Sequence, residues 1–175
     1  MSPFLKTTLC TSVLALAGCA SAPPVTVRSQ VPGGSEIAIV MFRDCTIPGQ
    51  EDCGGSGLTA GSIFARVLSE KPSLRAVPLS RPVAASAQLD DSAAVAFAKE
   101  KGYKYVLNGE VEDYYRVAPM TFRTERAGVS VRLLNTANGD VVAFFSERTH
   151  SASNLTTPDA LLQKMAVHVR DSIIQ

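Results

Sequence analysis

The glycine-rich run Gly54-Gly55-Ser56-Gly57, which precedes a predicted helix, is the first pattern whose residue types could do chemistry. A phosphate-binding loop needs a Lys and a Ser or Thr after its glycines, and Leu58-Thr59 supplies no Lys. A nucleophile elbow needs Gly-x-Ser-x-Gly, and Leu58 occupies the position of the last glycine. The run therefore predicts a turn that leads into a helix N-terminus. Weak anion binding by its free backbone amides is the alternative.

Glu110, Glu112 and Asp113 form an acidic cluster on a predicted strand, where alternation places Glu110 and Glu112 on the same face. Paired carboxylates could serve a hydrolase. Arginines such as Arg132 and Arg148 on neighbouring predicted strands favour instead a solvated network of cross-strand ion pairs. Because no nucleophile motif accompanies the cluster, we expect no catalytic residues and a protein that is not an enzyme.

The N-terminal residues have the organisation of a lipoprotein signal peptide. Lys6 supplies a positive charge, and residues 7–17 form an apolar stretch that is too short to span a bilayer. Leu16-Ala17-Gly18-Cys19 is similar to a bacterial lipobox, in which a transferase alkylates the Cys thiol with a diacylglyceryl group, whose acyl chains include palmitate, and the preceding residues are removed. Ala20 follows instead of the Asp that marks retention in the inner membrane. We therefore expect a lipid anchor on Cys19 that holds the protein in the outer membrane.

Cys45 and Cys53 would then lie in the oxidising periplasm, where two cysteines at this spacing are expected to form a disulfide. The loop 46–52 contains a Pro and a Gly and is short enough to bring the two α-carbons to bonding distance. A redox-active pair would be expected as Cys-x-x-Cys. His150 and His168 are distant in sequence and lack the spacing of zinc ligands, so we expect no metal and no cofactor.

An aromatic and arginine-rich segment connects two long predicted strands around Pro119. Loops that gather aromatic rings and guanidinium groups suit recognition of a protein or a glycan better than a place in a core. A hairpin connection tucked against the domain is the alternative. The candidate residues for binding a partner or ligand are Tyr114, Tyr115, Phe122, Arg123 and Arg126.

Hydrophobic periodicity predicts the elements that position these residues. Strands are expected over 37–42, 74–79, 103–117, 126–136 and 140–150. Helices are expected over 57–70, from a cap at 90–92 to Gly102, and from Pro158 to the C-terminal region. Asn138-Gly139 predicts a type I′ turn between the last two strands. The fold class is therefore α/β, a single mixed β-sheet in the order β-α-β-α-β-β-β-α with helices packed on it.

The chain is expected to divide into three parts. Residues 1–18 form the signal peptide. Residues 19–35 contain three Pro and a Gly-Gly pair, which predicts a lipidated flexible tether. Residues 36–175 form the periplasmic α/β domain, with ordered structure beginning at Glu36.

Composition narrows the class of protein. The 175 residues include 17 Lys+Arg and 16 Asp+Glu with no basic cluster, which argues against a nucleic-acid binder. A share of 46% hydrophobic and 19% charged residues argues against disorder. Removing 1–18 takes Lys6 away and leaves 157 of the 175 residues, formally neutral and enough for one core.

Two stretches carry a resemblance to known proteins. Tyr103-Lys-Tyr-Val-Leu-Asn-Gly-Glu-Val111 and the hairpin Val129–Val142 resemble a strand and hairpin pattern of a periplasmic lipoprotein superfamily. Its members include the curli-secretion channel lipoprotein, the lipoprotein of Pel polysaccharide export, the penicillin-binding-protein activator and the TolB amino-terminal domain. Gly55-Ser56-Gly57, Tyr114–Arg126 and Pro158–Leu162 are similar to motifs of the DUF4823 family, small bacterial lipoproteins of unknown function. That family carries a Trp in the middle segment, and this chain has none.

The resemblance implies a non-enzymatic outer-membrane lipoprotein that faces the periplasm. Its expected role is that of an accessory or assembly subunit of an envelope or secretion complex. Its partners would be the membrane, through the lipid anchor, and another protein or further copies of the chain. A periplasmic binding module for a glycan, a peptidoglycan fragment or a lipid is the alternative.

Overall fold

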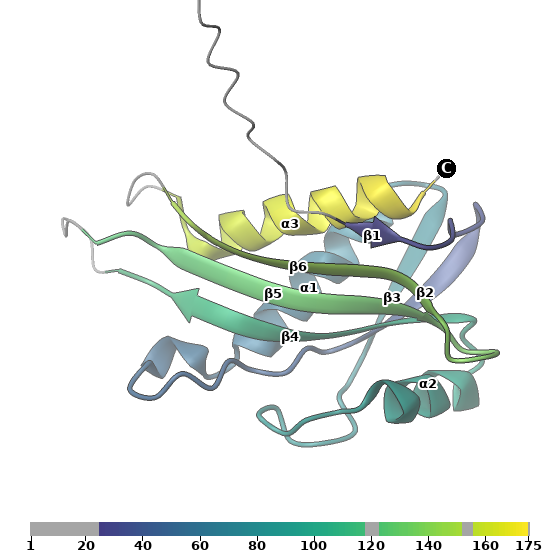
Figure 1. Ribbon diagram of the computed structural model, residues 1–175, viewed down its shortest axis with the longest axis horizontal. Helices are drawn as coiled ribbons and strands as arrows, with labels where there is room; N and C mark the ends of the chain where they lie inside the picture. Colours follow the sequence, from purple (N-terminus) through teal and green to yellow (C-terminus); the bar gives the residue numbers. More distant parts are fainter. Residues whose placement is uncertain (1–24, 118–122, 152–155, 175) are drawn as a thin grey trace, which may run out of the picture.

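The computed structural model describes residues 25–117, 123–151 and 156–174, and their strands form one sheet (Figure 1). The sheet has six strands in the order β1-β6-β5-β4-β2-β3. β2 is parallel to β3 and β4, and all other neighbours are antiparallel. The strands are β1 (Thr26–Val27), β2 (Ser35–Val40), β3 (Leu74–Leu79), β4 (Tyr105–Tyr115), β5 (Arg126–Asn135) and β6 (Val141–His150). This single mixed sheet confirms the predicted fold class.

Helices pack on both faces of the sheet but cover them unequally (Figure 1). α1 (Ser56–Ser69) and α3 (Pro158–Ile173) enclose the larger core with one face, and Phe42, Phe64 and Phe145 are fully buried there. α2 (Asp91–Glu100) encloses a smaller core with the other face. Across the described ranges, no helix combines the length and the apolar composition that crossing a membrane requires.

The β5–β6 hairpin differs from the prediction in its turn. The expected two-residue turn at Asn138-Gly139 is replaced by a wider loop, in which the Gly139 N–H donates to the Asn135 carbonyl at 2.8 Å. Side-chain oxygens stabilise the wider loop, because Asn135 Oδ1 accepts the Ala137 N–H at 2.9 Å and Asn138 Oδ1 accepts the Asp140 N–H at 3.1 Å. One part of the prediction is confirmed, because Gly139 adopts the left-handed conformation, with φ 79°, that a type I′ turn would also require of it.

Ordered structure begins earlier than the predicted boundary at Glu36. Thr26–Val27 pairs with β6, and Val31 is 1% exposed in the larger core. The expectation of a flexible tether over 19–35 is therefore wrong from Val25 onward. Its Pro and Gly content indicates flexibility, but the three valines between the prolines supply apolar side chains that the core takes up. The predicted signal peptide and Cys19 lie outside the described residues.

The junction between β2 and α1 depends on a close backbone contact. A Cβ atom at Gly57 would lie 2.1 Å from the carbonyl oxygen of Phe42, a separation at which the backbone has to move. Gly57 is itself buried in the first turn of α1. The glycine therefore lets the helix start directly against the end of the strand.

We predict that Gly57→Ala lowers the free energy of unfolding by about 2–3 kcal/mol, because the added methyl group overpacks this contact. Gly33→Ala is the matched control. Gly33 has no atom within 4 Å of an added Cβ and does not adopt a positive φ. Its replacement should change the free energy by less than about 0.5 kcal/mol. Urea unfolding measures both values, and equal effects would contradict the assigned role of Gly57.

Candidate functional site

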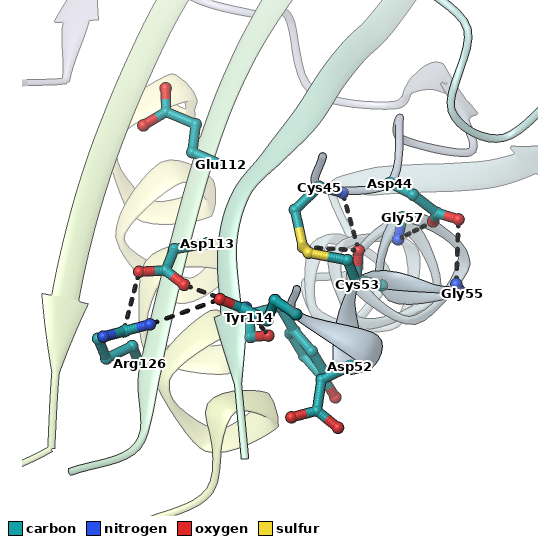
Figure 2. Close-up of a disulfide and its surroundings, with 12 residues drawn as sticks. Asp44, Cys45, Asp52, Cys53, Gly55, Gly57, Glu112, Asp113, Tyr114 and Arg126 are labelled. Carbon is teal, nitrogen blue, oxygen red and sulfur yellow. Dashed lines mark hydrogen bonds and ion pairs between the residues drawn. A yellow bond between two sulfur atoms is a disulfide. The ribbon is translucent and has the colours of Figure 1, made fainter. Parts of the chain in front are cut away.

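Several elements meet at one end of the sheet. They are the disulfide loop, the end of β4, the start of β5, and the first turns of α1 and α3. Figure 2 shows the disulfide of this region beside the start of α1 and the end of β4. The loop includes a short 3-10 helix, Glu51–Cys53, which contacts β4. Most of the predicted binding segment lies at this end, so it is the candidate site.

Cys45 and Cys53 are joined by a disulfide with an α-carbon separation of 5.0 Å. Both cysteines are buried, and the Cys45 N–H donates to Ser56 Oγ at 3.1 Å. The bridge therefore fixes the loop to the N-terminus of α1. Its burial between loop and helix indicates a structural bond.

Two of the amides at the start of α1, those of Gly55 and Gly57, are already occupied (Figure 2). Asp44 accepts the Gly57 N–H at 2.7 Å with Oδ1 and the Gly55 N–H at 3.0 Å with Oδ2. Its carboxylate caps the helix and complements the positive end of the helix dipole. Anion binding by these amides, the alternative interpretation of the glycine run, is therefore wrong for this helix N-terminus.

Tyr114 lies in the core instead of on the surface expected for a binding residue, and it is 5% exposed. Its hydroxyl donates to Asp159 Oδ1 at 2.5 Å and accepts a hydrogen bond from Arg116 at 2.8 Å. Arg116 also pairs with Asp159 at 2.9 Å. Burial raises the pKa of the Tyr114 phenol, and the bond to Asp159 raises it further. This side chain joins the end of β4 to the first turn of α3.

Tyr115 points to the solvent-accessible side of the same end. The Arg126 guanidinium lies 4.7 Å from the centre of its ring, and Arg123 donates to its hydroxyl at 3.0 Å. Arg126 also forms an ion pair with Asp113, at 3.1 Å, and the Asp113 side chain is almost fully buried. Stacked and anchored in this way, the tyrosine and the two arginines present a pre-ordered polar surface. We call Tyr115, Arg123 and Arg126 the rim.

Several residues of this region were not identified from the sequence. Gln50 donates to the Tyr114 carbonyl and to Asp113 Oδ1, and Asp52 accepts the Arg116 N–H at 3.0 Å. They connect the disulfide loop to β4 across more than sixty positions of sequence, so no local pattern reveals them. The one available signal is the acidic pair beside Cys53. Phe122, the remaining predicted residue, lies outside the described ranges.

The acidic residues of β4 pair with arginines, as the sequence predicts, but with different partners. Glu112 pairs with Arg148 at 3.5 Å, which confirms one expected contact. Glu110 pairs with Arg43, at the end of β2, through a bridge that the sequence does not indicate. Arg132 pairs instead with Asp91 of α2, at 2.9 Å. These pairs are partly exposed and form a solvated network.

Within residues 25–117, 123–151 and 156–174, no group of three His, Cys, Asp or Glu side chains is arranged to hold a metal ion. The side chains at this end offer guanidinium groups, carboxylates and a phenol ring that are held by one another. This chemistry suits contact with polar or anionic groups of a partner or ligand.

We predict different effects for the two neighbouring tyrosines. Tyr114→Phe removes a buried hydroxyl that bonds to both a carboxylate and a guanidinium, so the free energy of unfolding should fall by about 1–2 kcal/mol. Tyr115→Phe, the matched control, removes one exposed hydrogen bond and should cost less than about 0.5 kcal/mol. Thermal or urea unfolding gives both values. A larger loss for Tyr115→Phe would contradict the assignment of Tyr114 to the core.

No family model and no curated protein matches the chain. Among solved structures, a PelC dodecamer from Paraburkholderia phytofirmans aligns with a TM-score of 0.65 and 19% identity, over 88% of this chain and 98% of the PelC chain. A PelC variant from the same organism aligns with a TM-score of 0.64 and 18% identity, over 88% of this chain and 99% of the PelC chain. Lipoprotein GNA1162 from Neisseria meningitidis aligns with a lower TM-score of 0.49 and 18% identity, over 79% of this chain and 97% of the GNA1162 chain. The chain thus shares the fold of the PelC subunit.

Proposed function

We propose that this chain is a non-enzymatic lipoprotein of the outer membrane that faces the periplasm and serves as an accessory or assembly subunit of an envelope or secretion complex. The observation that carries the proposal is the shared fold with PelC, which was solved as a dodecamer and is covered almost completely by the alignment. The lipobox-like Leu16–Cys19 supports the membrane location. Membership in the DUF4823 family belongs to the same proposal.

The mechanism would be positional. Lipid on Cys19 would fix the N-terminus to the membrane, and the structure describes the domain from Val25 onward. Residues 19–24 could therefore span at most roughly 20 Å when fully extended. This reach is shorter than that of the tether expected from the sequence, so the domain would work close to the membrane surface. The rim would then be presented to a partner or to a further copy of the chain.

Metabolic labelling tests the anchor. Wild-type protein should take up labelled palmitate, and Cys19→Ala should not, because the thiol that carries the diacylglyceryl group is gone. Cys10→Ala is the matched control and should keep the label, since Cys10 lies inside the predicted signal peptide. Label on the Cys19→Ala protein would contradict lipidation at this residue.

The assembly role is tested by the mass of the protein released from native membranes in mild detergent. Light scattering should give several copies of the chain or a stoichiometric complex with another protein. The double variant Arg123→Ala and Arg126→Ala should shift the mass toward the monomer, since both side chains belong to the rim. A wild-type monomer without a partner would contradict the proposal.

A binding module for a glycan, a peptidoglycan fragment or a lipid is the second candidate. The observation that favours it is the Tyr115 ring beneath Arg126, an aromatic and cationic surface already ordered by hydrogen bonds. Native mass spectrometry with a purified muropeptide fraction should then detect a bound saccharide on a monomer, and Tyr115→Ala should abolish it. Absence of a complex with the wild-type protein would count against this candidate.

A further inference from the structure

The outer edge of β6 is only partly covered. β1 pairs with it at Ala143 and Phe144, and the Val142 carbonyl accepts the Arg28 N–H at 2.8 Å. β6 continues well beyond Phe144. This edge therefore pairs with one antiparallel strand near its start, and the rest of β6 has no strand beside it among the described residues.

Strand alternation determines which backbone groups point outward along that length. The Ser151 N–H donates to the Glu125 carbonyl at 2.9 Å, so the odd-numbered residues of this stretch bond toward β5. Ser146, Arg148 and His150 consequently direct their N–H and C=O groups to the outer edge. No strand in the described part of the chain pairs with them there. Unpaired groups of this kind form a template for a further strand.

A groove lies directly beside this edge, between β6 and α3. Its volume is about 330 Å³. Leu161 and Met165 of α3 are buried side chains in its lining, while β6 contributes polar ones. We call it the β6 groove and define it by Glu147, Thr149, Leu161, Lys164, Met165 and His168. An added strand would place alternate side chains into such a groove, which is how edge-binding domains gain specificity.

The chain itself is poorly suited to fill this edge. Continuing the register of Thr26 opposite Phe144 would place Pro24 opposite Ser146. Pro24 has no N–H to donate to the outward carbonyl of Ser146 and therefore interrupts the ladder.

A second copy is also disfavoured. The two-fold register that pairs the whole of Ser146–His150 with its symmetry mate sets Arg148 opposite Arg148. Like charges directly opposite each other destabilise a strand pair. This symmetric pairing is therefore disfavoured, which favours a segment of a different protein as the occupant.

Glu147 indicates the chemistry of that segment. Its side chain lines the β6 groove, and no Lys or Arg among the described residues lies within 4.0 Å of its carboxylate. Burial raises the pKa of Glu147, although the neighbouring His168 lowers it. A partly buried carboxylate that has no Lys or Arg partner is stabilised by an incoming basic side chain.

We propose that the outer edge of β6 receives an extended segment of another envelope protein, which adds as a strand beside Ser146–His150 and directs a basic side chain toward Glu147 in the β6 groove. This edge adjoins the rim, because His150 lies opposite Arg126 in the β5–β6 ladder, but it faces away from β5. The inference goes beyond the proposed function, because it concerns a second surface and holds whether or not the chain assembles with copies of itself.

The test is photo-crosslinking in living cells, with a photoreactive phenylalanine at Lys164 beside the groove. The same residue at Ala93, on the exposed side of α2, is the position control. Ser146→Pro removes the outward N–H without touching the bonds to β5, so the adduct should fall roughly tenfold. Ser146→Ala is the matched control, because it removes only the hydroxyl that bonds to Glu112 and should keep the adduct.

Mass spectrometry of the adduct then identifies the crosslinked segment. The proposal is supported by one segment of another protein that carries Lys or Arg, depends on the Ser146 N–H, and weakens with Glu147→Lys. It is overturned by adducts with residues 19–24, by adducts with a second copy, by the absence of adducts, or by adducts that Ser146→Pro leaves unchanged. The palmitate label and the mass of the assembly are read separately, so each proposal can fail alone. Ser146→Pro should retain cooperative unfolding, which confirms that the variant folds.

Discussion

The contact between the end of β2 and the start of α1 is the constraint on which the rest of the site depends. Gly57 allows the helix to begin against the Phe42 carbonyl, and the Asp44 carboxylate takes the first free amides. This fixes the direction in which the chain leaves the strand. The disulfide loop has to fold back over the same junction, which carries Gln50 and Asp52 to the end of β4.

The helices and strands could be predicted because their signals are local. The apolar run after Glu36, the cap at Thr157 and the stop at Gly102 act within a few residues of the elements that they define. β1 has two residues, too few to show a period, and it exists only because β6 offers an edge. The prediction of the hairpin turn was wrong for a related reason, since Asn135 and Asn138 each accept the N–H two residues further on and stabilise a wider loop.

The site was less predictable than the fold, because contacts distant in sequence decide its side chains. Tyr114 and Tyr115 are neighbours of the same type, yet one is buried against Asp159 and the other lies under Arg126. An irregular register in β4 precedes them, between Val111 and Asp113, and it sets which side each ring takes. Sequence alone locates such a segment without assigning a role to each residue.

The position of β1 also determines how the domain would carry load. If lipid is attached to Cys19 as proposed, a pull on it would reach the described residues first through the two paired residues of β1 and then through the buried Val31. Detaching β1 and Val31 would release residues 25–34 and lengthen the connection between lipid and domain by roughly 30 Å. The larger core would lose the Val31 side chain, while α1, α3 and the other five strands would keep their mutual contacts. The N-terminal strand would thus detach under tension before the rest of the domain unfolds.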